Sequence, residues 1–169
     1  MESDFFQWFS WDEIVVFFVS MVPFLEVQVA LPLAVGAYQF SAEKAFWIVL
    51  IGNSLPLVIL LPLCERLMRF LARRFTWIDQ HVHQKLQQLR SDHQRSYDRF
   101  GVIVLWFFRA IPLPGTGMWS ASLLAQALLI PKWKACLAIL CGNIVASIIV
   151  LLASQGVFEH LWPYLKSLL

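Results

Sequence analysis

Two long runs without a charged side chain constrain this chain more than any other feature of its sequence. They cover residues 45–64 and 135–158. A helix of about 20 apolar residues is long enough to cross a hydrocarbon core about 30 Å thick. We therefore predict one transmembrane helix at residues 43–64 and a second at residues 134–156.

The composition of the whole chain agrees with a membrane protein. Of its 169 residues, 59% are hydrophobic and 14% are charged, whereas a soluble domain carries about 25% charged residues. The mean hydropathy is +0.67. A soluble domain of this size has too little interior for so much apolar surface. With a net charge of +2, membrane lipids are expected partners and nucleic acid is not.

Two further apolar stretches are interrupted by polar residues and prolines. Glu26 and Gln28 interrupt the first stretch, which covers residues 14–37. Arg109 interrupts the second, residues 100–131, shortly before the string Pro-Leu-Pro-Gly-Thr-Gly. Proline removes a backbone donor and breaks helices, and an ionisable residue at mid-bilayer costs at least about 2.5 kcal/mol.

Irregular backbone at membrane depth is tolerated only inside protein or beside a water-filled cavity. We therefore interpret the two stretches as re-entrant helical hairpins, at residues 8–39 and 100–130. Three prolines are expected to help break the helices: Pro32, Pro112 and Pro114.

The two halves of the chain resemble each other. Ala-Leu-Pro-Leu at residues 30–33 recurs as Ala-Ile-Pro-Leu at residues 110–113. Five residues of the first half recur with a constant offset of 90: Lys44, Ala45, Leu50, Gly52 and Asn53. We predict a first repeat at 1–63, a second at 100–156 and a C-terminal tail at 157–169.

The segment between the repeats, residues 64–99, sets the expected orientation. It holds 8 of the 13 basic residues and 4 acidic ones, and positively charged loops stay cytoplasmic. Apolar residues recur at steps of three or four between Leu71 and Leu89, with basic residues among them. This pattern predicts a cytoplasmic amphipathic helix on the membrane surface.

With this linker inside, the two repeats are inverted and their hairpins point at each other. The predicted fold is an all-α integral membrane protein, an inverted repeat of a re-entrant hairpin and a transmembrane helix. That plan is typical of secondary transporters. No enzyme, metal site or cofactor is predicted, because neither the cysteines nor the histidines have a suitable spacing.

The strings PFLEVQVALP at residues 23–32 and FRAIPLPGTGMW at residues 108–119 resemble the small multidrug export family of bacteria and archaea. That family is related to the DedA (SNARE-associated, VTT) superfamily. The resemblance implies paired re-entrant hairpins, a transport role and, in DedA relatives, movement of lipids such as undecaprenyl phosphate. We expect a multi-pass protein of the bacterial cytoplasmic membrane.

One departure from the family's pattern concerns the first hairpin. The family shows an arginine two positions after the glutamate and then a glycine, where this chain has Gln28 and Val29. Arg109 lies in the opposite hairpin, where an aliphatic residue is expected. Our hypothesis is that Arg109 replaces the missing basic partner of Glu26.

Glu26, Gln28 and Arg109 are the candidates for proton coupling, with Glu26 as the proton carrier. Burial disfavours a charged carboxylate and a nearby arginine favours it, so alternation between such environments would couple proton movement to transport. Two alternatives stay open: a static Glu26–Arg109 pair that locks the halves together, and no contact at all.

Arg109 with Gly115, Thr116 and Gly117 is a candidate phosphate site. Glycines allow a turn that exposes consecutive N–H groups, and the following helix presents its positive end there. Trp119 is a candidate contact for the lipid chain. The alternative is a tight helix break with Arg109 reaching the inner interface.

Asn53 and Asn143 are predicted to support the site by packing and hydrogen bonding between the spanning helices. The leading function is translocation of an anionic lipid phosphate, such as undecaprenyl phosphate or a phospholipid, with proton coupling as an open alternative to a static pair. Export of small hydrophobic or cationic compounds is the second hypothesis, and a structural membrane protein the third. A homodimer that buries the hairpins is a further open alternative.

Overall fold

The computed structural model of this chain describes residues 10–74 and 94–166, and throughout these ranges its regular structure is helical. The elements are α1 (Trp11–Met21), α2 (Glu26–Pro32), the π-helical η2 (Leu33–Ala37), α3 (Ala42–Ser54), α4 (Pro56–Arg74), α7 (Gln94–Ala110), α8 (Met118–Ala127) and α9 (Lys132–Lys166).

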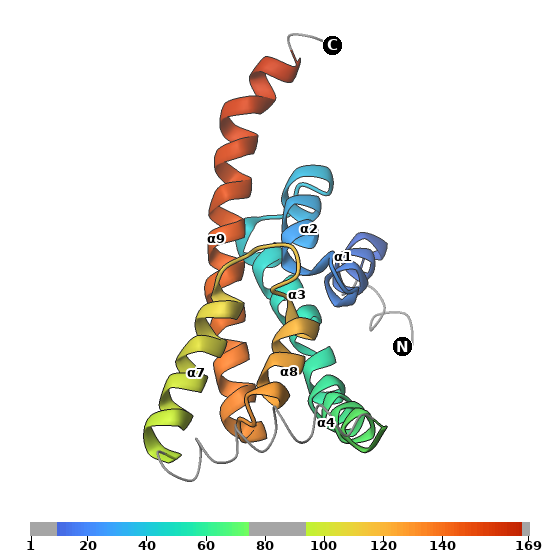
Figure 1. Ribbon diagram of the computed structural model, residues 1–169. Coiled ribbons are helices and arrows are strands. Elements are labelled where there is room, and N and C mark those ends of the chain that lie inside the picture. The colour runs from blue at the N-terminus through green and yellow to red at the C-terminus, as the bar shows by residue number, and fades with distance from the viewer. Residues whose placement is uncertain (1–9, 75–93, 167–169) are drawn as a thin grey trace, which may run out of the picture.

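The long helix α9 is the axis of the molecule (Figure 1). α7 runs beside the first half of α9, and α2 packs against α9 further along. The second helix of each helix pair crosses to the opposite half of the chain, since α8 packs mainly on α4 while α2 packs on α9. Helices α2, α4, α8 and α9 therefore interlock around the centre of the molecule.

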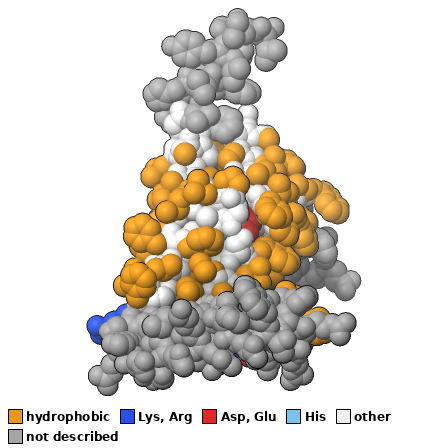
Figure 2. All heavy atoms as spheres, viewed as in Figure 1, with side chains coloured by type: hydrophobic (Ala, Val, Ile, Leu, Met, Phe, Trp, Pro, Cys, Tyr) orange, Lys and Arg blue, Asp and Glu red, His pale blue; other side chains and the backbone are white. Residues whose placement is uncertain are grey.

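Within the described residues, two helical segments are long and apolar enough to cross a membrane: Ala42–Leu67 and Lys132–Gly156. This agrees with the two predicted transmembrane helices. Their outward faces are apolar: Val58 and Leu152, for example, are 77% and 63% exposed. Hydrophobic side chains cover most of the described surface in Figure 2, as expected for a protein surrounded by lipid.

The helix boundaries differ from the predicted ones in three places. The first span consists of two helices, α3 and α4, separated at Leu55, because Pro56 has no N–H for a helical hydrogen bond. α4 then continues to Arg74, and α9 continues to Lys166 instead of ending at 156. Most of the predicted amphipathic linker, residues 75–93, lies outside the described residues.

The break in the first helix pair includes Pro23 and comes before Pro32. The chain turns at residues 22–25, where Phe24 has a φ of 70°, and α2 begins at Glu26 with a φ of 37°. Pro32 does not break the helix. The backbone widens after it into a π-helical turn, closed by the Tyr38 N–H donating to the Leu33 carbonyl.

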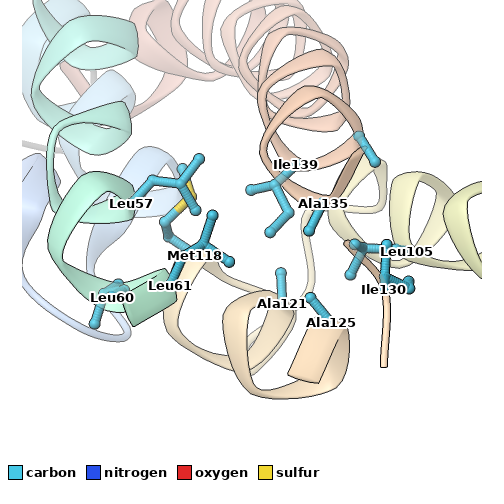
Figure 3. Close-up of a cluster of buried hydrophobic side chains, with 11 residues drawn as sticks. Leu57, Leu60, Leu61, Leu105, Met118, Ala121, Ala125, Ile130, Ala135 and Ile139 are labelled. Atoms are coloured by element: carbon cyan, nitrogen blue, oxygen red, sulfur yellow. The ribbon is translucent and has the colours of Figure 1, made fainter. Parts of the chain in front are cut away.

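Two hydrophobic clusters hold the halves together. One joins α4, α7, α8 and α9 through buried side chains, among them Leu57, Leu105, Met118 and Ile139 (Figure 3). The other joins α1, α2, α3 and α9, and its buried members include Val16, Val27 and Val49. Because α9 contributes to both clusters, it fixes the position of the polar residues between them.

Candidate functional site

Glu26 is the acidic residue at the centre of the molecule. It is the first residue of α2, and it is only 3% exposed. The Met118 N–H, at the start of α8, donates to both carboxylate oxygens of Glu26 at 2.9 and 3.0 Å. The carboxylate at the start of α2 therefore caps the positive end of α8, which belongs to the other half of the chain.

The backbone around this contact is adapted to bring the carboxylate close. A positive φ at Phe24 and at Glu26 is unfavourable for residues with a side chain, by about 1–3 kcal/mol each. Gly117, the N-cap of α8, lies directly against the carboxylate, and a Cβ there would overlap Glu26. Such strained, glycine-dependent approaches cluster at functional sites.

Arg109, the predicted basic partner, lies next to Glu26. Its Nη2 atom is 3.7 Å from Glu26 Oε2, and the side chain is completely buried. Nη2 also donates to Asn143 Oδ1. Within the described residues, Arg109 Nε and Nη1 have no hydrogen-bond partner. Complete burial excludes the alternative in which Arg109 reaches the interface.

Asn143 and Asn53 extend this pair into a network between the two spans. Asn53 Nδ2 lies 2.9 Å from Asn143 Oδ1, and Asn143 Nδ2 donates to Ser54 Oγ at 3.0 Å. With its amide rotated by half a turn, Asn53 instead donates to the Ser20 carbonyl at 3.1 Å and accepts from Arg109 Nη2 at 2.7 Å. Both orientations place Asn53 in contact with the site.

Two glycines make room for the network. A Cβ at Gly142 would lie 2.8 Å from both Arg109 Cβ and the Trp106 carbonyl. A Cβ at Gly52 would lie 2.8 Å from the Phe17 carbonyl and would overlap the Ser20 hydroxyl. Each span thus meets the first helix of its own half at a glycine, as the predicted packing role requires.

The loop between α7 and α8 is held in a tight turn by the side chain of Thr116. Thr116 Oγ1 lies 2.7 and 2.9 Å from the carbonyls of Ile111 and Leu113, and it accepts from the Leu113 N–H at 3.1 Å. Gly115 has a φ of 97°, which favours glycine. In this conformation the Thr116 hydroxyl stabilises the turn.

Gln28 lies on α2 and reaches the same loop. Its Nε2 donates to the Leu113 carbonyl at 2.6 Å. Beside this contact is a small pocket of about 30 Å³ lined by Glu26, Phe24, Gly115 and Trp119. Such a volume holds little more than one water molecule, so a phosphate group does not fit without a movement of the loop.

The predicted site residues therefore fall into two groups. Glu26, Arg109, Asn53 and Asn143 form one buried network, while Gln28 and the 115–119 segment border it. Sequence reasoning missed three partners: Ser20, Ser54 and the Met118 N–H. Serines and backbone groups carry no rare signal in a sequence. Ser54 could have been indicated because it directly follows Asn53, whereas Ser20 and Met118 are distant in sequence from both asparagines.

Two membrane-spanning helices around a buried carboxylate–guanidinium pair define a helical membrane protein with a polar centre. The family model described as "Putative small multi-drug export protein" matches residues 26–149. The chain belongs to this family of export proteins, and the match includes Glu26, Arg109 and both asparagines. No curated protein and no solved structure matches the chain.

Proposed function

We propose that this chain is a transporter built as an inverted repeat, with two re-entrant hairpins that meet at its centre. The helices of the first hairpin are too short to cross a bilayer: α1 has 11 residues and α2 with η2 covers Glu26–Ala37. At about 1.5 Å per residue, neither exceeds about 18 Å, against a hydrocarbon core of about 30 Å.

The contacts at the two glycines support the repeat. Phe17 and Ser20 of α1 pack against Gly52, and Trp106 and Arg109 of α7 pack against Gly142. Phe17 and Trp106 are 89 residues apart, and so are Ser20 and Arg109. The two glycines are 90 residues apart. Asn53 and Asn143, which are also repeat-related, contact each other across the centre.

The proposed substrate is an anionic lipid phosphate, such as undecaprenyl phosphate or a phospholipid head group. The observation that carries this proposal is the position of the Glu26 carboxylate on the Met118 N–H and beside Arg109. A helix N-terminus and an arginine are donors that bind phosphate well. Glu26 therefore occupies an anion site that belongs to the opposite hairpin.

Proton coupling follows from competition for these donors. A protonated Glu26 has no negative charge to hold the Met118 N–H and Arg109, and the two donors become available to a phosphate. Deprotonation returns Glu26 to the donors and expels the anion. Gln28 and the Gly115–Gly117 turn have to move for the phosphate to enter, since the pocket beside them holds about 30 Å³.

The full chain in liposomes tests this proposal. Movement of a fluorescent lipid phosphate from the inner to the outer leaflet is followed by adding a membrane-impermeant quencher, with and without a pH gradient. We expect the wild type to respond to the gradient, Glu26→Gln to lose the response because glutamine mimics the protonated acid, and Arg109→Gln to stop the movement.

Glu43→Gln is the matched control, because Glu43 is an exposed carboxylate outside the network; its movement of lipid and response to pH should equal those of the wild type. No movement of lipid phosphate at any gradient would overturn the substrate. A full gradient response in Glu26→Gln would overturn the coupling and favour a static ion pair.

A second candidate function is export of small lipophilic cations. It is favoured by the residues beside Glu26, since Phe24 and Trp119 line the same pocket, and a carboxylate with aromatic rings is suited to a cation. In the same liposomes, efflux of a quaternary ammonium dye that is lost in Trp119→Ala, without any lipid movement, would select this function. Movement of neither substrate would favour a structural protein.

A further inference from the structure

A second cavity shares Gln28 with the small pocket beside Glu26. It is a groove of about 420 Å³ lined by α2, α9 and the loop that follows α7, where α2 and α9 lie side by side (Figure 1). This volume is within the usual range of ligand sites, whereas the pocket beside Glu26 holds about 30 Å³. Ile149, which lines the groove, is 44% exposed, so the groove opens toward the surrounding lipid.

The lining of this groove is suited to a hydrocarbon chain. The described residues that line it carry no charge, and five of them are apolar: Pro32, Pro112, Ile149, Val150 and Ala153. The Ser154 hydroxyl, which also lines the groove, donates to the Val150 carbonyl of its own helix at 2.7 Å. A charged head group would lose its hydration here without gaining a charged partner, whereas an apolar chain fits such a surface.

The groove lies where the two halves of the chain meet. Pro32 and Pro112 occupy the same position in the repeated Ala-x-Pro-Leu string, and both line the groove. Asn53 and Asn143, a second repeat-related pair, contact each other in the central network. Transporters built from inverted repeats bind their substrate at the interface of the repeats. The groove therefore has the position expected for part of a substrate path.

One hydrogen bond lies at the border of the groove and the pocket. Gln28, which lines both cavities, donates from Nε2 to the Leu113 carbonyl at 2.6 Å. Leu113 directly follows Pro112 of the groove and comes two residues before Gly115 of the pocket. The Gln28 side chain and this loop thus form the partition between the two cavities.

We infer that the groove holds the hydrocarbon chain of a lipid phosphate, and that Gln28 separates this chain from the head-group site. The inference rests on the proposed transport of a lipid phosphate. The lipid enters the groove sideways from the bilayer, and its phosphate reaches Arg109 and the Met118 N–H when the Gln28–Leu113 hydrogen bond opens. Gln28 is thereby a positioning residue, which controls access to the site and carries no proton.

Photo-crosslinking of the full chain in a neutral detergent tests the chain site. The probe is phosphatidic acid with a diazirine in one acyl chain, and it should label residues 149–154. Ala153→Trp fills the groove from an exposed position and should reduce this label at least about tenfold. Leu152→Trp is the matched control, because it adds the same ring to a residue that is 63% exposed and does not line the groove.

Competition separates a bound chain from ordinary contact with lipid. An excess of unlabelled phosphatidic acid should remove the label from residues 149–154, whereas diacylglycerol, which lacks the phosphate, should not. Equal competition by the two lipids would overturn the inference, and so would equal labelling of Ala153→Trp and the wild type. A crosslink between two copies of the chain at these residues, in place of the lipid label, would show that a second copy occupies the groove.

Gln28→Leu tests the partition in the liposome assay. Leucine keeps most of the side-chain volume and removes the hydrogen bond to Leu113, so lipid phosphate should move about threefold to tenfold faster. Gln126→Leu is the matched control, because Gln126 also donates to a backbone carbonyl, that of Leu61, and lines neither cavity. An unchanged or lower rate in Gln28→Leu would overturn the role of Gln28.

The two measurements separate this inference from the proposed function. If the wild type moves no lipid phosphate but still gives a competed label at residues 149–154, the proposed transport is wrong and the chain site stands. If lipid phosphate moves at the wild-type rate in Ala153→Trp, the transport stands and the groove is not on its path, which overturns the inference.

Discussion

The interface of α1 with α3 and the interface of α7 with α9 are both built around a glycine. They differ in the polar residue that lies beside this glycine. In both, a shorter helix packs against a glycine of a long apolar helix, at Gly52 and at Gly142. In the first, the Ser20 hydroxyl donates to the carbonyl of Phe17 in its own helix, at 2.6 Å. In the second, Arg109 takes the corresponding place and reaches out of its helix to Asn143 and Glu26.

The comparison shows that the two halves share the glycine and the asparagine at which their helices pack, whereas their charged residues differ. Glu26 and Arg109 belong to different halves of the chain and meet at the centre. Glu13 and Lys44 pair within the first half. Variants at corresponding positions of the two halves therefore separate two contributions to stability. One is the packing at the glycines and asparagines, and the other is the ion pairing.

The largest difference is expected between Arg109→Met and Ser20→Ala. Arg109→Met leaves the Glu26 carboxylate buried without its basic partner and should lower the free energy of unfolding by about 3–5 kcal/mol. Ser20→Ala removes one local hydrogen bond and should lower it by about 1 kcal/mol. Unfolding in mixed detergent micelles containing increasing SDS measures both.

The double variant Glu26→Gln/Arg109→Met sharpens this result. If the two side chains interact as a pair, the double variant should be more stable than Arg109→Met alone, because no uncompensated charge is left. Additive losses from the two substitutions would contradict a coupled pair.

Alanine substitutions at the two glycines test whether both halves need the same close packing of helices. Gly52→Ala and Gly142→Ala each bring a Cβ to 2.8 Å from a backbone carbonyl, and overpacking of this kind costs about 1–3 kcal/mol. We expect similar losses in the two halves. Gly156→Ala is the control, since nothing lies within 4 Å of the added Cβ, and it should be neutral or slightly stabilising. A loss in one half only would argue against the repeat.

The two asparagines should differ in a smaller way. Asn143 contacts Arg109, Asn53 and Ser54, so Asn143→Ala leaves buried donors unpaired and should cost about 2 kcal/mol. Asn53→Ala should cost about 1 kcal/mol, because the arginine keeps Asn143. The same unfolding measurement ranks them, and a larger effect at Asn53 would contradict the position of Asn143 at the centre.

The smallest expected effect concerns Lys44 of the first half. Lys44 pairs with Glu13 but is itself 45% exposed, so Lys44→Gln should cost about 0.5–1 kcal/mol. The same unfolding measurement checks this, and an unchanged free energy of unfolding would contradict a stabilising Lys44–Glu13 pair.

Much of this arrangement could be predicted from the rarity of charge in an apolar chain. Glu26 and Arg109 were identified because each interrupts an apolar stretch, and Asn53 and Asn143 because they recur with a fixed offset. The two spans agree with their predicted positions. Such signals are strong since a polar residue in a membrane needs a partner.

The local backbone could not be predicted in the same way. Pro32 was expected to help break a helix, whereas a π-helical turn accommodates it. The close approach of Gly117 to the Glu26 carboxylate is a second feature that the sequence does not predict. Both outcomes depend on which segment of the other half lies opposite, and a single pattern along the chain does not contain that information.

The burial of Arg109 has a consequence for the order in which the chain is made. Arg109 lies in the last turn of α7, and an arginine within the hydrocarbon core is unfavourable by at least about 2.5 kcal/mol. Synthesis proceeds from the N-terminus, so the segment that carries Glu26 is in place before α7 emerges. The first half then acts as an assembly template for the second. We expect a fragment that begins at residue 94 to be degraded when expressed alone and to accumulate when residues 1–93 are supplied as a separate polypeptide.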